Sequence, residues 1–210
     1  RGSSQRAVRT FPKETRKEDG VHRRTTQAQG LCVKEHEMTT PAIVPNFGSD
    51  NSDRKLAIIC SKGNLDMAYP FLILANEALC EGVETLIFFT FWGFDMITKS
   101  RMNDLQFSPA GNTAMHLPGS NKHLPQAMMP APGMTAIATK MLKKQIADLD
   151  VPEIPDFLDQ IVAAGGHLWA CRMSADMNKL TMKDLREDVE GIINASDFIE
   201  MTEGAQLLFI

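Results

Sequence analysis

The residue of this chain with the clearest chemical potential is a cysteine that closes a short apolar run. Cys171 ends the run over residues 167–171, and a polar stretch that should open a helix follows it. The unpaired N–H groups and the dipole at a helix N-terminus favour a thiolate. Such surroundings bring a thiol pKa from about 8.5 to about neutral or below. The pattern, with Arg172 adding a positive field, indicates a reactive thiol that is at least partly exposed in a pocket. The alternative is that Cys171 is a small buried hydrophobic residue without a chemical role.

A second cysteine, Cys60, also closes an apolar run, and a polar turn over residues 61–64 follows it. Cys60 is either a resolving thiol or second sulfur site for Cys171, or a buried strand residue. The turn joins a strand to a helix N-terminus, where anions bind, but it lacks a full glycine-rich phosphate motif. The residues expected to line the pocket are Ser61, Lys62, Gly63, Asn64, Arg172, Met173 and Ser174.

Metal-binding patterns are weak in this sequence. The cysteines form no CxxC pair, and no H-E-x-x-H motif is present. Soft methionine sulfurs near residues 116–123, from Met128, Met129 and Met134, would suit Cu(I). Adaptable packing, at a subunit contact or over the active site, explains the same methionines better. We therefore expect no metal site.

Charge and hydropathy narrow the function classes. The chain has 210 residues and a net charge of −4, but residues 1–37 hold nine Lys/Arg against five Asp/Glu, which leaves the remainder at −8. An acidic body argues against a nucleic-acid partner, because phosphate binding needs a basic face. The apolar stretch over residues 85–94 is far shorter than the roughly 20 residues of a membrane span. Four widely spaced cysteines and no signal peptide favour the cytoplasm.

The sequence divides into an extension and one domain. Residues 1–53 are expected to be a disordered N-terminal extension and linker, and Met38 offers an alternative start that would leave residues 1–37 outside the native protein. Residues 54–210 form the domain. Within it, residues 104–133 are rich in proline and methionine and are expected to be an irregular insertion: a lid, a subunit contact or a disordered segment.

The domain pattern alternates strands and helices. Apolar runs predict strands over 55–60, 84–91, 167–171, 197–201 and 206–210, and helical spacing predicts helices over 65–81, 134–149, 155–164 and 181–190. In the second helix we expect Ile137, Met141 and Ile146 to face inward. The order predicts a flavodoxin-like α/β fold: an open, mostly parallel five-stranded sheet with helices on both faces. Ligands of such sheets lie beyond the carboxyl ends of the strands, where Cys60 and Cys171 fall.

Four segments of the domain together resemble one protein family. They are the turn and helix start over 60–70, the run Ile-Phe-Phe-Thr-Phe-Trp-Gly-Phe over 87–94, the motif Ala-Cys-Arg-Met-Ser with Asp-Met over 170–177, and the terminal Leu-Phe-Ile. In combination they resemble the DsrE/DsrF/DsrH-like family, and most closely its larger bacterial and archaeal subgroup with a methionine- and proline-rich central insertion. The resemblance covers about residues 54–210.

The resemblance implies a role in intracellular sulfur trafficking. It assigns to Cys171 a persulfide that is passed to partner proteins, with a small sulfur-carrier protein and a rhodanese as implied partners. We therefore expect a cytoplasmic sulfur carrier or sulfurtransferase that needs no organic cofactor, because a thiolate attacking sulfane sulfur is itself the chemistry. Whether the chain turns over as an enzyme stays open.

Two other functions stay open at this point. One is a non-catalytic oligomeric binding or regulatory module for a small anion or nucleotide. The other is a thiol-based redox protein that uses Cys171 and Cys60. For assembly, we expect a homo-oligomer with the Cys171 pocket near an interface that buries Trp92, Met128 and Met129.

Overall fold

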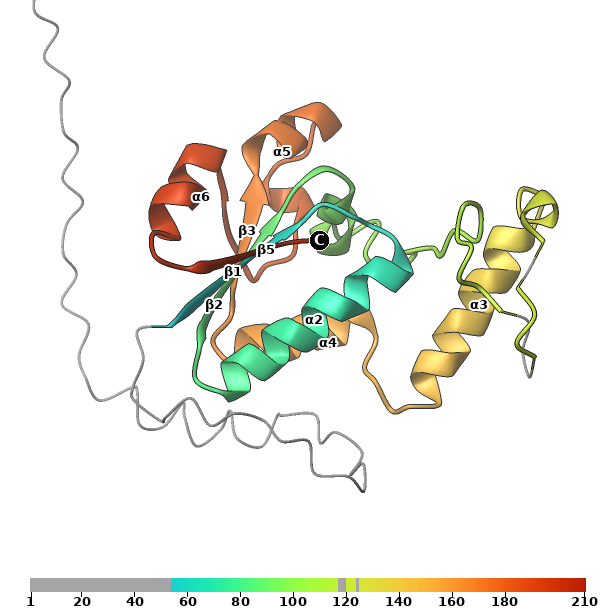
Figure 1. Ribbon diagram of the computed structural model, residues 1–210. Helices are drawn as coiled ribbons and strands as arrows, with labels where there is room; N and C mark the ends of the chain where they lie inside the picture. Colours follow the sequence, from blue (N-terminus) through green and yellow to red (C-terminus); the bar gives the residue numbers. More distant parts are fainter. Residues whose placement is uncertain (1–53, 117–119, 124) are drawn as a thin grey trace, which may run out of the picture.

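A single parallel sheet organises the domain (Figure 1). The structure is a computed structural model that describes residues 54–116, 120–123 and 125–210; the expectations for residues 1–53 lie outside this range. All strand pairs are parallel, in the order β4-β3-β2-β1-β5. The strands are β1 (Lys55–Cys60), β2 (Glu84–Phe89), β3 (His167–Cys171), β4 (Val189–Ile193) and β5 (Gln206–Phe209).

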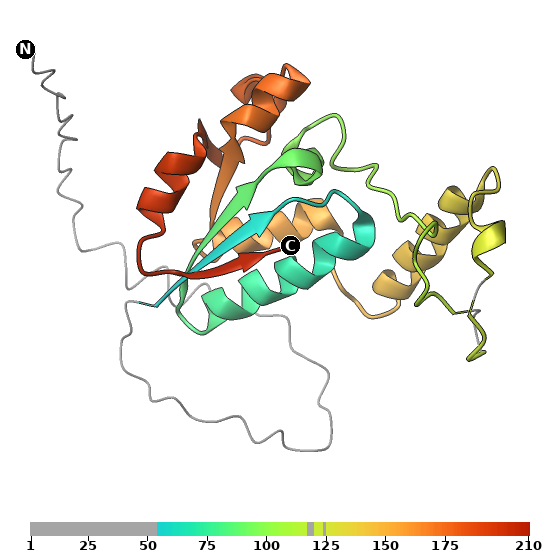
Figure 2. The same ribbon diagram turned by 45° about the horizontal axis from the view of Figure 1, so that its top comes forward.

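The expected open parallel sheet with helices on both faces is confirmed. The strand order differs from that of flavodoxin itself, because β1 lies between β2 and β5, whereas in flavodoxin β1 lies between β2 and β3. Helices α2 (Leu65–Cys80) and α4 (Ile154–Ala163) cover one face. Helices α5 (Arg172–Asn178) and α6 (Ala195–Met201) lie on the opposite side in both views (Figures 1 and 2).

Two apolar clusters fill the two sides of the sheet. Side chains alternate along each strand, so Ile58 and Cys60 point toward α2 and α4, the α2/α4 face. Ala57, Phe88 and Cys171 belong to the smaller cluster on the α6 face. There Phe198 of α6 stacks on Phe88 with ring centroids 4.5 Å apart. Cys60 and Cys171 therefore lie on opposite faces of the sheet.

The C-terminal third departs from the sequence prediction. Thr181 and Asp184 form a capping box, but it opens only the 3-10 turn η4 (Met182–Asp184), and the predicted helix over 181–190 is wrong because the chain then extends into β4. The predicted strand over 197–201 is also wrong, because Asn194 and Asp197 form a second capping box that starts α6.

Two glycines let the loops after β1 and β2 pack against each other. A Cβ added to Gly63 would lie 2.2 Å from the carbonyl oxygen of Trp92, and one added to Gly93 would lie 2.3 Å from the carbonyl oxygen of Cys60. The N–H of Thr90 donates to that same Cys60 oxygen at 2.9 Å. Contact this close is open only to glycine, and it fixes the backbone of residues 90–93 at the carboxyl edge of the sheet.

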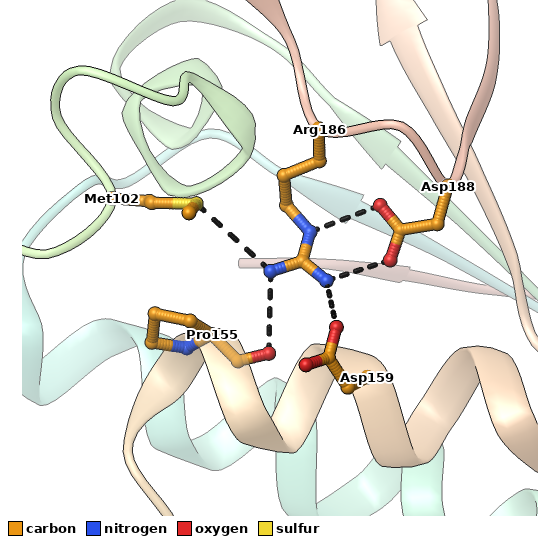
Figure 3. Close-up of polar contacts among 5 residues, drawn as sticks. All are labelled: Met102, Pro155, Asp159, Arg186 and Asp188. Atoms are coloured by element: carbon orange, nitrogen blue, oxygen red, sulfur yellow. Dashed lines mark hydrogen bonds and ion pairs between the residues drawn. The ribbon is translucent and has the colours of Figure 1, made fainter.

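A buried arginine joins α4 to the start of β4 (Figure 3). Arg186 is only 7% exposed. Its guanidinium donates to both carboxylate oxygens of Asp188, at 3.0 and 2.6 Å, to Asp159, and to the Pro155 carbonyl at 3.2 Å. Burial alone would lower the pKa of Arg186, but these hydrogen bonds and carboxylate charges outweigh it and raise the pKa. The guanidinium therefore stays charged, and its hydrogen bonds hold α4 and the start of β4 together.

The insertion and helix α3 (Met134–Ala147) project from the sheet-containing body (Figures 1 and 2). Apart from the short turn η3 (Gln126–Met128) and an isolated bridge, the described residues of 104–133 are irregular, as predicted. Ile137 is 57% exposed rather than facing inward, because α3 meets the body mainly around Ala138. None of the helices in the described part of the chain is long and apolar enough to cross a membrane.

Candidate functional site

The thiol of Cys171 lies at the carboxyl end of β3 and at the N-cap of α5. The side chain is 5% exposed, which is less open than the sequence indicated. The physical reason is its position on the α6 face, where it joins Ala57, Phe88 and Phe198 in one apolar cluster. The site is therefore a nearly enclosed thiol with apolar neighbours.

Hydrogen-bond donors converge on the sulfur of Cys171. They are the backbone N–H groups of Ser174 and Met173 and the hydroxyls of Thr90 and Ser174. Burial alone would raise the pKa of Cys171, but these hydrogen bonds outweigh it and bring the pKa below the ordinary thiol value. The thiolate, which is the nucleophilic form, is thereby favoured.

The two hydroxyls are held in place by their own contacts. Ser174 is fully buried, its Oγ lies 3.2 Å from Oγ1 of Thr90, and it accepts the N–H of Phe91 at 2.7 Å. Asn178 donates to the Ser174 carbonyl at 2.9 Å. Phe91 has a φ of +46°, an uncommon conformation for a bulky residue. This turn aims the Phe91 amide at Ser174.

Thr90 is the site residue that sequence reasoning missed. It follows β2 directly, and β2 pairs with β3. A polar residue at the carboxyl end of a strand next to the one that carries Cys171 is the signal that would have found it, because adjacent parallel strands end at the same edge of the sheet.

The second predicted thiol has a contrasting environment. Cys60 is fully buried, and its Sγ donates to the Lys62 carbonyl at 3.6 Å. Burial raises the pKa of Cys60 to about 12. At neutral pH Cys60 is therefore a protonated core residue.

The register also separates the two thiols. Phe89 of β2 pairs with Cys60 on one side and with Ala170 on the other. Two strand spacings put the Cα atoms of Cys60 and Ala170 about 9.5 Å apart, and Cys171 is the next residue along β3. A disulfide needs Cα atoms within about 7 Å. Since the side chains of Cys60 and Cys171 also leave opposite faces of the sheet, the structure does not bring the two sulfurs together.

The predicted turn over 61–64 lies at the same edge but has other contacts. The N–H and Oγ of Ser61 both donate to the Ile210 carbonyl, at 2.6 and 2.9 Å, and Lys62 is exposed. Gly63 and Asn64 line a depression of about 360 Å³, whose other lining residues are Trp92, Asp95, Asp104, Leu105, Gln106, Ser108 and Thr135. The second half of the turn therefore lines a depression that does not include Cys171.

The residues after Cys171 divide between the site and the surface. Arg172 is exposed and donates to the Ile192 carbonyl at 2.8 Å. Met173 and Ser174 contribute the donors to the sulfur. Of the seven predicted lining residues, these two are the ones whose hydrogen-bonding groups lower the pKa of Cys171.

Exposed apolar side chains flank this site. Phe91 and Trp92 follow Thr90 and are 45% and 62% exposed. Met173 and Met177 are also exposed and lie one turn apart on α5. Large apolar side chains that gather on a surface mark contact sites.

The candidate soft-metal residues are only partly brought together. The rings of His116 and His123 lie 4.4 Å apart in an isolated bridge. Met128 is exposed and Met129 is buried. Among the described residues, no group of three or more His, Cys, Asp or Glu is arranged to hold a metal ion.

The contrast between the two thiols gives a direct prediction. With iodoacetamide at pH 8 on the folded protein, we expect Cys171 to be alkylated well before Cys60. A pKa of about 12 for Cys60 leaves about a thousandfold less thiolate than in an ordinary cysteine. Peptide mass mapping measures both sites, and labelling in denaturant, where both cysteines react, is the control. Equal native labelling would contradict the assignment.

The sequence of this chain is similar to those of known proteins. The model of the DsrE/DsrF/DrsH-like family matches residues 52–209. The sulfur carrier protein DsrE2 of Allochromatium vinosum is 35% identical over 138 residues, which cover 65% of this chain and 86% of that protein. The uncharacterized protein YrkE of Bacillus subtilis is 28% identical over 167 residues, 75% of this chain and 97% of that one.

A solved structure is also similar in outline. The protein of unknown function MTH1491 from Methanobacterium thermoautotrophicum superposes with a TM-score of 0.47 and 10% identity. The match covers 75% of this chain and all of that one.

Proposed function

This chain belongs to the DsrE/DsrF/DrsH-like family, and from that premise we propose that it is a sulfur carrier that holds sulfane sulfur as a persulfide on Cys171. The observation that carries the proposal is the set of donors on the Cys171 sulfur, which favour its thiolate. The Allochromatium vinosum relative, a sulfur carrier protein by name, supports the same class of activity.

The proposed chemistry needs only thiols and sulfane sulfur. In loading, the Cys171 thiolate attacks the outer sulfur of a donor persulfide; a new S–S bond forms, the donor S–S bond breaks, and the donor leaves as a thiolate. In release, an acceptor thiolate attacks the outer sulfur on Cys171, and Cys171 leaves as a thiolate. Sulfur moves at constant oxidation level in both steps, so no further oxidant or reductant is required.

The proposal includes partners and an assembly. A small sulfur-carrier protein and a rhodanese are the proposed partners, the cytoplasm is the proposed compartment, and the chain is proposed to form a homo-oligomer. Exposed apolar side chains support a protein contact close to the thiol, namely Phe91, Trp92, Met173 and Met177.

The two alternative functions receive less support from the geometry. A redox protein would need Cys60 to reach Cys171, and the register and opposite faces keep them apart. An anion-binding module would need positive charge, but the depression beside the turn over 61–64 has Asp95 and Asp104 in its lining. The persulfide function is therefore the one that we propose.

Intact-mass spectrometry tests the proposal. After incubation with polysulfide, we expect the folded protein to gain about 32 Da per sulfur atom, as a nucleophilic thiolate should. Cys171→Ser is expected to lose the adduct, whereas Cys60→Ala, a matched removal of the other thiol of the sheet, is expected to retain it. An adduct that persists in Cys171→Ser, or no adduct on the folded wild-type protein, would overturn the assignment.

A further inference from the structure

We propose that Thr90 and Ser174 are positioning residues that make Cys171 a good leaving group, so that the site favours release of sulfur over its retention. This inference rests on the proposed persulfide function and names how the same site is tuned. Thr90 belongs to the loop after β2 and Ser174 to the first turn of α5. Neither side chain is the nucleophile; both act through the sulfur of Cys171.

Counting protons leaves one hydroxyl proton free for the sulfur. Each hydroxyl has one proton to donate and two lone pairs to accept with. The Phe91 N–H occupies one lone pair of Ser174 Oγ. The contact of 3.2 Å between Thr90 and Ser174 uses the proton of one hydroxyl at most. Whichever of the two donates in that contact, the other proton remains for Cys171, because the strand register sets Thr90 beside Cys171 and Ser174 lies in the first turn of the helix that Cys171 caps.

Burial and anchoring hold these donors in place. Thr90 is 8% exposed and Ser174 is fully buried, so bulk water is largely excluded from their hydroxyls. The Phe91 amide and the Asn178 side chain hold Ser174 from two sides. Fixed donors in a nearly dry site stabilise developing negative charge without first having to reorient.

The two half-reactions place opposite demands on these donors. During loading, negative charge leaves the Cys171 sulfur as it bonds to the incoming sulfur, so the hydrogen bonds weaken on the way to the transition state. During release, the S–S bond breaks and the charge returns to Cys171, so the same hydrogen bonds strengthen. Only interactions that strengthen in the transition state accelerate a step, and a lower pKa gives a faster leaving group but a weaker nucleophile.

A valine in place of Thr90 separates these effects. Thr90→Val keeps the shape and removes the hydroxyl, and Thr90→Ser keeps the hydroxyl. Each protein is loaded with polysulfide, and cyanide then removes the outer sulfur as thiocyanate, with Cys171 leaving as a thiolate. We expect Thr90→Val to slow this release by about tenfold, the usual effect of one hydrogen bond to a charged group, and Thr90→Ser to remain near the wild type.

The pH profile of Cys171 alkylation provides a second readout that does not depend on sulfur loading. Thr90→Val is expected to shift the profile to higher pH, while the alkylation rate well above both pKa values is unchanged or faster. Thr98→Val is the matched control, because Thr98 is also buried but donates to the Phe94 carbonyl at 2.8 Å. Thr98→Val should leave the profile where it is in the wild type.

The outcomes separate the two proposals. A folded Thr90→Val protein with the wild-type alkylation profile and release rate would overturn the inference. Failure of the wild-type protein to take up sulfur would instead overturn the persulfide function, while the alkylation profile would still report on the hydroxyl contact. Ser174→Ala, measured in the same two assays, decides the matter if Thr90→Val does not fold.

Discussion

Alanine in place of Gly93 is expected to destabilise the protein by about 3 kcal/mol or more, at the upper end of overpacking effects. The added Cβ would lie 2.3 Å from the backbone oxygen of Cys60 and 2.9 Å from its sulfur. Backbone in the central strands cannot yield as a flexible side chain does, so the loop after β2 must move. Urea unfolding followed by circular dichroism measures the loss.

The same substitution should disturb the Cys171 site. The N–H of Gly93 donates to the Thr90 carbonyl at 3.0 Å, and the N–H of Thr90 donates to Cys60, so moving Gly93 moves Thr90. We expect the alkylation profile of Cys171 to shift toward that of an ordinary thiol. Gly191→Ala is the control, since its Cβ would meet only the ring edge of Trp169, at 3.3 Å. Equal stability of the two variants would contradict the argument.

Methionine in place of Arg186 is expected to cost about 2–4 kcal/mol of folding free energy, somewhat below the usual range for breaking a buried pair. The discount reflects the exposure of one partner, Asp159. Methionine retains most of the length of arginine but leaves Asp188 and the Pro155 carbonyl without the guanidinium shown in Figure 3. Chemical unfolding at neutral pH measures the change.

An exposed basic residue provides the comparison for Arg186. Lys99 reaches Glu187 at 3.7 Å, and both side chains are largely in solvent. Lys99→Met is expected to change stability by less than about 1 kcal/mol, as is usual for a surface ion pair. If the two methionine variants were equally stable, the hydrogen bonds of Arg186 between α4 and the start of β4 would have no energetic role.

Much of the fold was predictable because local patterns determine it. The apolar runs that became β1 and β3 are bounded by polar or glycine residues, and α2 ends before Gly82, which has a φ of +73°. The helix predicted over 181–190 failed for a local reason, separate from the missed capping box that starts α6. A capping box marks where a helix starts but not how long it runs, and the β-branched pattern Val-Glu-Gly-Ile-Ile of β4 ends the helical stretch early.

The site was predictable in part only. The position of Cys171 at a strand end followed from its own segment. The donor Thr90 did not, because its contact with Ser174 joins residues 84 positions apart in the chain. The face on which each thiol lies also depends on register, since Cys171 is one residue beyond the partner of Phe89, and one step along a strand reverses the face.

The placement of Cys60 on the far side of the sheet also determines how Cys171 responds to peroxide. A thiolate oxidised to sulfenic acid is usually rescued when a neighbouring thiol condenses with it. Cys60 is on the α2/α4 face, and Cys80 ends α2 on that same side, so neither sulfur in the described chain reaches Cys171. Within the described part of the chain, no thiol is placed to rescue an oxidised Cys171, and a sulfenic acid that meets no thiol is open to further oxidation to the irreversible sulfinic state.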